Sequence, residues 1–419
     1  MKKLGILLLL LWAICSCSEE DHTEIPVRVI QRDYTFSGGR IARNVLESYL
    51  SRAITQSEFL ASEGFYNDGV YECPEDDERM LLNIGAKFIG RALYSWGFED
   101  HFNNPEWLGN AKAKLERMHA SDPDLIFQAG IFEIVTDKVN QLAVPDWVFT
   151  AFGKAVENRN FNYDAMKNPG GSGVNQWGNG SIPDITQEET RMFFYYMAVR
   201  YMEIGIEAIH FGQVELIAMG DKENHYAAWK DLLTKVREAA GTKARRGTVI
   251  CDGHMPGGGI VADGELLFDF VSFPMRIKEI SGDPERAELK KFYLDAIYGL
   301  TKGGVTPSGW VCDRCPYLVE FDNYGISSHP GVVNISEHFV WGYDEISWFY
   351  KQPEAYRNEF LIYADQYIKR VDPVGFIEMP GSRVVTLENG NTRYRANRVS
   401  ESLPSAQSQE ETIKAIWTE

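Results

Sequence analysis

Residues 206–221 have the sequence IEAIHFGQVELIAMGD. An apolar run comes first, His210 and a glycine follow, and Gln213 and Glu215 stand just before a polar turn. Segments with helical patterns precede and follow this stretch. Such an arrangement is typical of a parallel barrel strand whose carboxyl end carries functional side chains. We therefore predict a strand here, with Gln213 and Glu215 at its carboxyl end, at the mouth of the barrel.

The same alternation of short apolar runs and helical patterns extends along most of the chain. We predict eight strands, at 53–60, 88–96, 124–133, from 206, and at 247–252, 268–273, 304–311 and 374–378. We also predict a helix at 284–300, helical structure in 343–369 and a hairpin at 384–395 that turns at 388–390. Eight parallel strands with intervening helices predict an α/β fold, the (β/α)8 TIM barrel. An open doubly wound sheet would usually have a glycine-rich first turn, and the glycines at 257–259 lack that spacing.

Size and composition agree with one large domain, which we place at 36–419. The chain has 419 residues, of which 44% are hydrophobic and 13% aromatic, enough for a large core. Its formal net charge is −18, which repels phosphate backbones, so we expect no nucleic-acid partner.

The first residues resemble a lipoprotein signal peptide of Bacteroidota. A basic start and a short apolar segment lead to ICSC at 14–17, which is similar to a lipobox with Cys17 as the lipidated residue, and the acidic SEED follows at 18–21. The segment is too short and wrongly flanked to span a membrane; an ordinary cleaved signal peptide is the alternative. The resemblance implies a signal peptide at 1–17, a tether at 18–35, and an outer-membrane lipoprotein at the cell surface that touches the membrane only through Cys17.

Four further cysteines are present, and two of them form the CxxC motif Cys312–Cys315. A single CxxC lacks a second ligand pair for zinc, so we expect a local disulfide or two free thiols. We predict no metal and no cofactor.

Polar and aromatic side chains gather at the predicted strand ends. Carboxylates and tryptophans are the commonest of these side chains. Glycoside hydrolysis needs both: one carboxyl group protonates the leaving oxygen, a second acts as nucleophile or base, and aromatic rings stack on sugars. The predicted catalytic residues are Glu215, as general acid/base, with Glu378 or Asp252 as its partner. The predicted substrate-binding residues are Arg91, Trp96, Glu133, Trp177, Gln213, His254 and Trp310.

Each of these residues also has a structural alternative. Glu215 could be a salt-bridged rim residue, Asp252 could cap a turn at Asp252-Gly253, and some of the tryptophans could be packing residues. The pattern is similar to glycoside hydrolases encoded with glycan-uptake systems, which implies a carbohydrate substrate. It departs from the largest retaining clan, because Val214-Glu215 stands where that clan has Asn-Glu.

Two other functions remain open at this point. A noncatalytic glycan-binding lipoprotein would need only an open aromatic platform. A metal-dependent hydrolase would use His210, Asp252 and His254, although the sequence has no HxH or HExxH motif. The fold alone does not choose among these functions.

Overall fold

The computed structural model describes residues 30, 32–36, 38–61 and 74–418. Cys17, the predicted signal peptide and Cys73 lie outside the described residues. Of the predicted tether, Tyr34 is described, and its carbonyl accepts a hydrogen bond from Tyr49.

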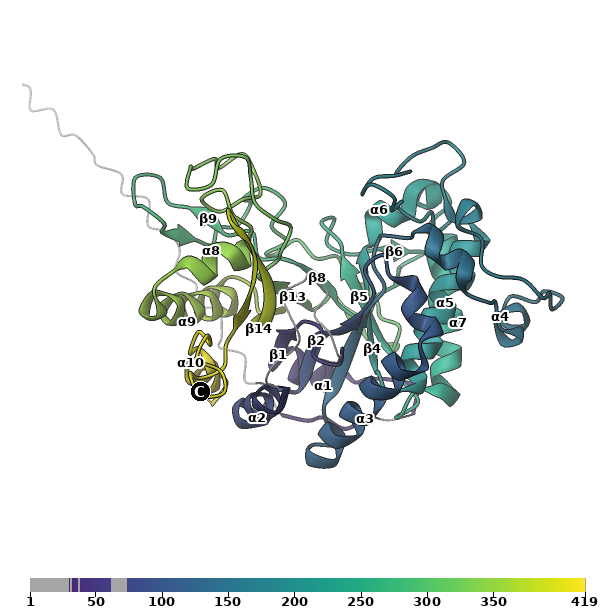
Figure 1. The fold of residues 1–419 in the computed structure, drawn as a ribbon, viewed down its shortest axis with the longest axis horizontal. Coiled ribbons are helices and arrows are strands. Elements are labelled where there is room, and N and C mark those ends of the chain that lie inside the picture. The colour runs from purple at the N-terminus through teal and green to yellow at the C-terminus, as the bar shows by residue number, and fades with distance from the viewer. Residues whose placement is uncertain (1–29, 31, 37, 62–73, 419) are drawn as a thin grey trace, which may run out of the picture.

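The predicted TIM barrel is confirmed. Eight strands pair in parallel in the order β1-β2-β3-β4-β5-β8-β13-β14, and β14 pairs with β1 to close the sheet (Figure 1). These strands are β1 (Ala53–Gln56), β2 (Phe88–Tyr94), β3 (Ile126–Gly130), β4 (Ala208–Gln213), β5 (Ile250–His254), β8 (Val271–Pro274), β13 (Tyr317–Glu320) and β14 (Gly375–Leu387).

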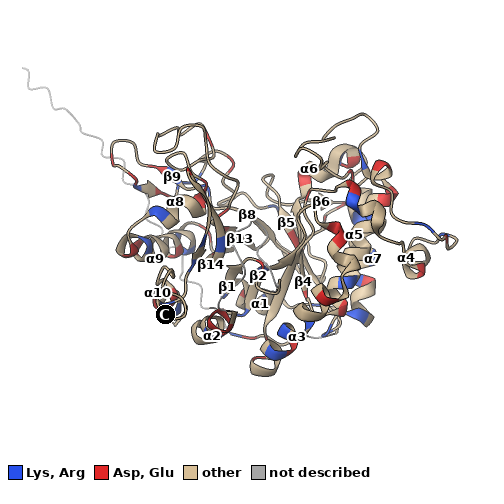
Figure 2. Ribbon diagram, viewed as in Figure 1, with Lys and Arg blue, Asp and Glu red and all other residues tan. Residues whose placement is uncertain are grey.

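Helices surround the barrel, and Figure 2 shows that acidic and basic residues are interspersed on several of them. The α-helices are α1 (Arg43–Leu50), α2 (Pro74–Ile84), α3 (Pro105–Ser121), α4 (Asp146–Ala151), α5 (Glu188–Glu203), α6 (Val214–Ala218), α7 (Ala227–Lys243), α8 (Glu345–Lys351), α9 (Glu354–Val371) and α10 (Glu410–Thr418). Among the described residues, no helix has the length and apolar character needed to cross a membrane.

Seven of the eight predicted strands are confirmed, but the seventh, 304–311, is wrong. The seventh barrel strand is β13, and 304–311 instead contributes β11 (Gly304–Val305) and the start of β12 (Val311–Cys312) to a small sheet with β6 (Val261–Ala262) and β7 (Glu265–Leu266). The apolar residues of 304–311 face outward: Val305 is 38% and Val311 70% exposed. All four residues of β13 are buried, so only β13 can join the barrel wall.

The predicted helix at 284–300 is also wrong. The connection from β8 to β13, all of it described, contains no α-helix; it has β9 (Lys278–Glu279), β10 (Ala287–Glu288) and turns. Phe292 and Leu294 have positive φ angles of 61° and 47°, which no right-handed helix allows. The hairpin is confirmed: β14 and β15 (Gly390–Arg395) pair antiparallel with Leu387 opposite Gly390.

The barrel interior has two layers of different chemistry. The lower layer is apolar and is covered by Val45, Leu46 and Tyr49 of α1 at the amino end of the barrel. Side chains two positions further along a strand point to the same face, so the next layer contains the residues at each position plus two. The lower layer is Ala53, Phe88, Ile126, Ala208, Ile250, Phe270, Leu318 and Phe376, and the upper layer is Thr55, Gly90, Gln128, His210, Asp252, Ser272, Glu320 and Glu378.

Gly90 in the upper layer provides the space that Glu378 occupies. A Cβ atom on Gly90 would lie 1.7 Å from Glu378 Oε1 and 2.9 Å from its Cδ. We expect Gly90→Ala to displace Glu378 and to lower the free energy of unfolding by about 1–3 kcal/mol, the usual cost of overpacking. Thermal unfolding measures the change.

The matched control is Gly109→Ala on α3, where an added Cβ would have no neighbour within 4 Å. Helix propensity predicts unchanged or slightly higher stability for this variant. Equal unfolding temperatures for the two variants would contradict the role of Gly90.

Candidate active site

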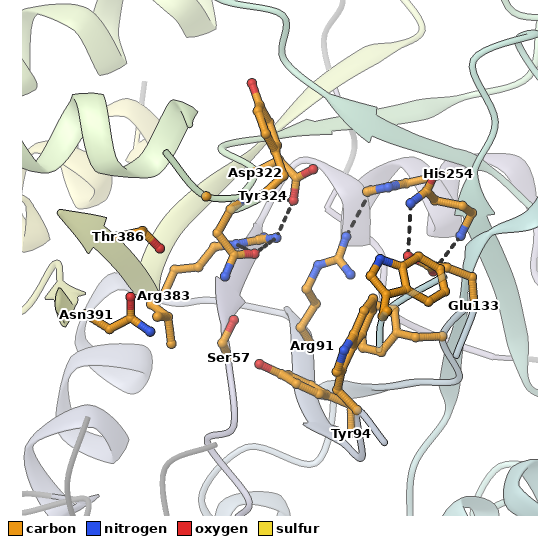
Figure 3. A pocket seen from close by; sticks show the side chains of 18 residues that line it. Ser57, Arg91, Tyr94, Glu133, His254, Asp322, Tyr324, Arg383, Thr386 and Asn391 are labelled. Atoms are coloured by element: carbon orange, nitrogen blue, oxygen red, sulfur yellow. Dashed lines mark hydrogen bonds and ion pairs between the residues drawn. The ribbon is translucent and has the colours of Figure 1, made fainter. Parts of the chain in front are cut away.

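A cavity of about 380 Å³ opens at the carboxyl ends of the barrel strands (Figure 3). Its volume lies within the range of small-ligand sites, roughly 300–1,000 Å³. Segments far apart in sequence form its walls: the ends of β2 and β4, and the loops that follow β3 and β13. The β14–β15 hairpin, Ser57 after β1, His254 of β5 and Trp177 of the segment 158–185 complete it. The lining residues are Ser57, Arg91, Tyr94, Trp96, Phe132, Glu133, Trp177, Gly212, Gln213, His254, Asp322, Asn323, Tyr324, Gly325, Arg383, Val384, Thr386 and Asn391.

Four aromatic rings form one wall of this cavity. The ring of Trp96 lies 5.6 Å from that of Trp177, edge to face, and 5.5 Å from that of Phe132. Phe132 lies 5.2 Å from Tyr94, also edge to face. Rings in this arrangement support one another and present apolar faces and edges to the cavity, the surface that a sugar ring contacts.

Glu133 is held beside this wall by the irregular end of β4. The pairing of β4 with β5 shifts register between His210 and Gln213. Gly212, at φ 53°, lies so close to Glu133 that an added Cβ would be 2.2 Å from Oε2. Gln213 donates its backbone N–H to Glu133 Oε2 and its side-chain Nε2–H to Oε1, both at 3.0 Å. These two bonds fix the plane of the Glu133 carboxylate.

A second irregularity places Arg91. The β2–β3 pairing shifts register between Ile89 and Leu93, and Arg91 has a φ of 54°, which is strained for a non-glycine residue. Its Nε donates to Glu320 Oε2 at 3.0 Å, and Nη2 donates to Oε1. Nη2 also lies 3.0 Å from His254 Nε2, which itself lies 2.7 Å from Glu320 Oε1.

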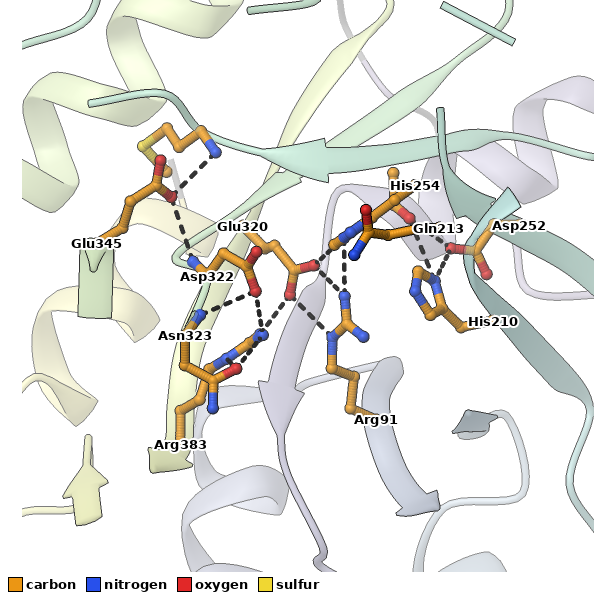
Figure 4. Close-up of polar contacts among 12 residues, drawn as sticks. Arg91, His210, Gln213, Asp252, His254, Glu320, Asp322, Asn323, Glu345 and Arg383 are labelled. Atoms are coloured by element: carbon orange, nitrogen blue, oxygen red, sulfur yellow. Dashed lines mark hydrogen bonds and ion pairs between the residues drawn. The ribbon is translucent and has the colours of Figure 1, made fainter. Parts of the chain in front are cut away.

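Glu320 is fully buried and is shared by two guanidiniums (Figure 4). Besides Arg91, Arg383 of β14 donates to it through Nη1. Burial alone would raise the pKa of Glu320, but the positive charges of Arg91 and Arg383 hold this pKa well below its usual range. Glu320 is therefore a permanent carboxylate.

Arg383 connects Glu320 to the loop that follows β13. Its Nη2 donates to Asp322 Oδ1 at 2.7 Å, and its Nε donates to Asn323 Oδ1 at 3.0 Å. Asp322 Oδ2 makes no hydrogen bond within the part of the chain that the structure describes. At the cavity, Asp322 therefore has one oxygen, Oδ1, that accepts hydrogen bonds and one, Oδ2, that is uncommitted, meaning that it has no partner among the described residues.

The upper barrel layer contains a second set of titratable groups. Asp252 Oδ1 accepts from Gln128 Nε2 at 2.7 Å, while Oδ2 lies 2.8 Å from both His210 Nδ1 and Ser272 Oγ. Burial raises the pKa of Asp252 to about 7. Burial and the charge of Arg91 hold the pKa of His210 well below its usual value.

Glu378 differs from its register partner Glu320 on the neighbouring strand. Burial and the negative charge of Glu320 raise the pKa of Glu378 to about 8. At neutral pH the pair therefore comprises one carboxylate and one neutral carboxyl.

Six predicted substrate-binding residues line the cavity: Arg91, Trp96, Glu133, Trp177, Gln213 and His254. The seventh, Trp310, is outside it; its Nε1 donates to Ile41 O at 3.1 Å, and it packs on the apolar cluster at the amino end. Among the predicted catalytic residues, Glu215 is exposed on α6 and accepts from Gly257 N at 2.9 Å. Glu378 and Asp252 belong to the upper barrel layer and are not among the lining residues.

Sequence reasoning missed Glu320, Asp322, Asn323 and Arg383. The stretch 317–323, YLVEFDN, has the same signature as the other strands, a short apolar run followed by acidic and amide residues. Because the sequence predicts the seventh strand at 304–311, the polar residues that follow 317–320 are not among the predicted strand ends.

The residues of the predicted metal alternative do not form a ligand cluster. His210 bonds to Asp252, whereas His254 bonds to Glu320, and the described residues include no group of three or more His, Cys, Asp or Glu placed to hold a metal ion. Cys312 and Cys315 are buried free thiols, as is Cys251, so of the two expected states the thiols are observed.

No protein-family model matches the chain, and a search of curated proteins finds no match. Among solved structures, trehalose-6-phosphate hydrolase from Bacillus licheniformis is 11% identical with a TM-score of 0.35, and the alignment covers 66% of this chain and 58% of that chain. Isomaltulose synthase from Klebsiella sp. LX3 is 10% identical with a TM-score of 0.34, covering 67% and 59%. An α-galactosidase from Thermus thermophilus is 15% identical with a TM-score of 0.29, covering 55% and 46%. The chain spans less than two thirds of the length of each of these proteins. With TM-scores this low, we infer nothing about this chain from them.

Proposed function

We propose that this protein is an extracytoplasmic glycoside hydrolase that acts on an oligo- or polysaccharide. The observation that carries the proposal is the joint presence of two carboxylates, Glu133 and Asp322, in a cavity with a wall of four aromatic rings. Glycosidic bond cleavage needs two carboxyl groups that flank the bond, and aromatic rings stack on the flanking sugars.

The contacts of the two carboxylates suggest different roles. Both oxygens of Glu133 accept from N–H donors of Gln213, which orients the group as a nucleophile or base. Asp322 has one oxygen fixed by Arg383 and one that is uncommitted. We assign the uncommitted Oδ2 as the atom of Asp322 that faces the leaving oxygen.

This assignment replaces the catalytic residues predicted from sequence. Glu215 lies on the rim, where Gly257 holds it, and Glu378 and Asp252 lie beneath the cavity. In the proposal, Trp96 and Trp177 stack on sugar rings and His254 contacts the substrate.

The location is proposed from the sequence alone. The lipobox-like 14–17 and the acidic 18–21 favour attachment through Cys17 and display at the cell surface. Labelling of the protein with a radioactive fatty acid, lost in Cys17→Ser, tests this attachment.

Hydrolysis of a panel of plant and host glycans by Glu133→Gln and Asp322→Asn tests the catalytic assignment. Both variants remove a charge and keep the shape, so we expect kcat to fall by at least about 100-fold, since general acid–base catalysis contributes roughly 10²–10⁴-fold. Glu215→Gln is the matched control and should retain full activity. Full activity in both Glu133→Gln and Asp322→Asn would refute the assignment.

A noncatalytic glycan-binding protein is the second candidate function. One observation favours it: Asp322 is paired with Arg383, and the nearby carboxyl with a raised pKa, Glu378, does not line the cavity. Binding of a glycan without hydrolysis by the wild-type protein, with affinity lost in Trp177→Ala, would establish this function instead.

A further inference from the structure

Arg91 has one hydrogen-bonding nitrogen that the protein itself does not use. The residue is only 5% exposed and lines the cavity, where Figure 3 shows its guanidinium. Nε and Nη2 are engaged by Glu320 and His254, whereas Nη1 has no partner among the described residues. Arg91 Nη1 is not among the fully enclosed polar atoms that lack a partner, so it is accessible from the cavity, where a ligand oxygen can take the place of water as its acceptor.

The carboxyl group of Glu378 lies close enough to Arg91 for the charges of the two groups to interact. It lies in the layer beneath the cavity, against Gly90, the residue before Arg91 in the chain. Glu378 Oε1 is buried and makes no hydrogen bond with any residue that the structure describes. The charged and titratable groups that face Glu378 come from four strands: Arg91 of β2, Asp252 of β5, Glu320 of β13 and Arg383 of β14.

The charges at the cavity favour an uncharged ligand. Three carboxylates oppose two guanidiniums at the cavity and directly beneath it: Glu133, Asp322 and Glu320 against Arg91 and Arg383. An anionic sugar would meet net repulsion here, and the whole chain has a net charge of −18. A neutral hydroxyl can accept from Arg91 Nη1 and donate to a carboxylate such as Asp322 through its own hydrogen.

We propose that Arg91 determines specificity by donating Nη1–H to a hydroxyl oxygen of an uncharged sugar, and that Glu378 is a positioning residue that leaves this N–H free. The inference rests on the proposed function, because it names the sugar class that the same cavity takes. Ionisation of Glu378 places a second carboxylate beside Arg91 and draws the guanidinium away from the cavity. Since the pKa of Glu378 is raised to about 8 by burial and by Glu320, this change falls between pH 7 and pH 9.

Binding is tested with maltotriose, cellotriose and xylotriose as uncharged probes and trigalacturonic acid as the anionic probe. Quenching of tryptophan fluorescence, to which Trp96 and Trp177 contribute in the cavity, gives Kd at pH 7 and pH 9. We expect an uncharged trisaccharide to bind best and Arg91→Lys to weaken its binding by about 10- to 100-fold, the effect of a lost hydrogen bond to a charged group. The Kd of the wild type should rise several-fold from pH 7 to pH 9, and this rise should be clearly smaller in Glu378→Gln. Asp252, whose pKa is raised to about 7, titrates in both proteins, so the difference between them reports on Glu378.

Three results would overturn the inference: tightest binding of trigalacturonic acid, equal affinity in a folded Arg91→Lys, or the same pH response in the wild type and Glu378→Gln. Near-ultraviolet circular dichroism establishes whether Arg91→Lys is folded, and Glu378→Gln tests the inference if it is not. An infrared titration without ligand follows the protonated carboxyl band that Glu378→Gln lacks. If no probe binds, the proposed function and the role of Arg91 fail together, while this titration still decides whether Glu378 is neutral at pH 7.

Discussion

Glu320→Gln is expected to be the most destabilising single substitution at the site. The carboxylate neutralises Arg91 and Arg383, both at most 5% exposed, and contacts His254. Removing one member of a buried ion pair leaves an uncompensated charge and costs roughly 3–5 kcal/mol; here two cations lose the same partner. We expect thermal unfolding about 4–6 °C below the wild type, or accumulation of the variant as insoluble protein.

The outcome is sensitive to the charge of Glu320 rather than to its volume, because glutamine has nearly the same shape. An unfolding temperature within about 2 °C of the wild type would show that Glu320 is not the shared anion of this network. Glu378→Gln provides the comparison, since it makes the same chemical change at the register partner one strand away.

Glu378→Gln is expected to have the opposite effect and to stabilise the protein. Burial and Glu320 raise the pKa of Glu378 in the folded state to about 8, above its ordinary value of 4.5. Between these two pH values the unfolded chain releases the Glu378 proton while the folded chain retains it, so stability falls as pH rises. Glutamine is neutral in both states and avoids this cost.

The gain should therefore depend on pH. Relative to the wild type, the stabilisation should be small near pH 5, grow by about 1.4 kcal/mol per pH unit at most, and level off above about pH 8. Thermal unfolding of both proteins from pH 5 to pH 9 measures the difference. Asp252 has a raised pKa as well, so the wild type and the variant will share part of the pH dependence, and only their difference reports on Glu378. A difference that does not change with pH would contradict a neutral Glu378.

The sequence predicted much of the scaffold and a large part of the cavity wall. Strands such as β4 were recognisable because a barrel strand is apolar along its length and ends in polar residues, a pattern that depends only on local order. The same logic found Arg91, Glu133, Gln213 and His254. It failed at β13, because 304–311, which contains Val305 and Val311, precedes the four-residue strand YLVE at the expected place of the seventh strand but lies outside the barrel.

Strand-end position alone did not identify which carboxylates reach the cavity. Glu215 follows β4 directly, but the chain turns into α6 after Gln213, and the side chain of Glu215 points to Gly257 at the rim. Glu378 and Asp252 lie within β14 and β5 rather than at their ends, and the alternation of each strand points them into the barrel, one layer below the cavity. Asp322 reaches the cavity from two residues beyond the end of β13.

The sequence by itself determined the class of fold, the order of most strands and the strand ends at which polar chemistry gathers, because hydrophobic periodicity and turn residues act over a few positions along the chain. Only the tertiary structure decided how those ends are combined. The register shift in β2 sets the position of Arg91, and the register shift in β4 places the Gln213 donors that bind Glu133. The seventh strand, β13, supplies Glu320, and the loop after it supplies Asp322. The charge state of each carboxyl also depends on groups from distant strands: Glu320 is ionised beside two arginines, and Glu378, its neighbour, is neutral because it is buried beside Glu320.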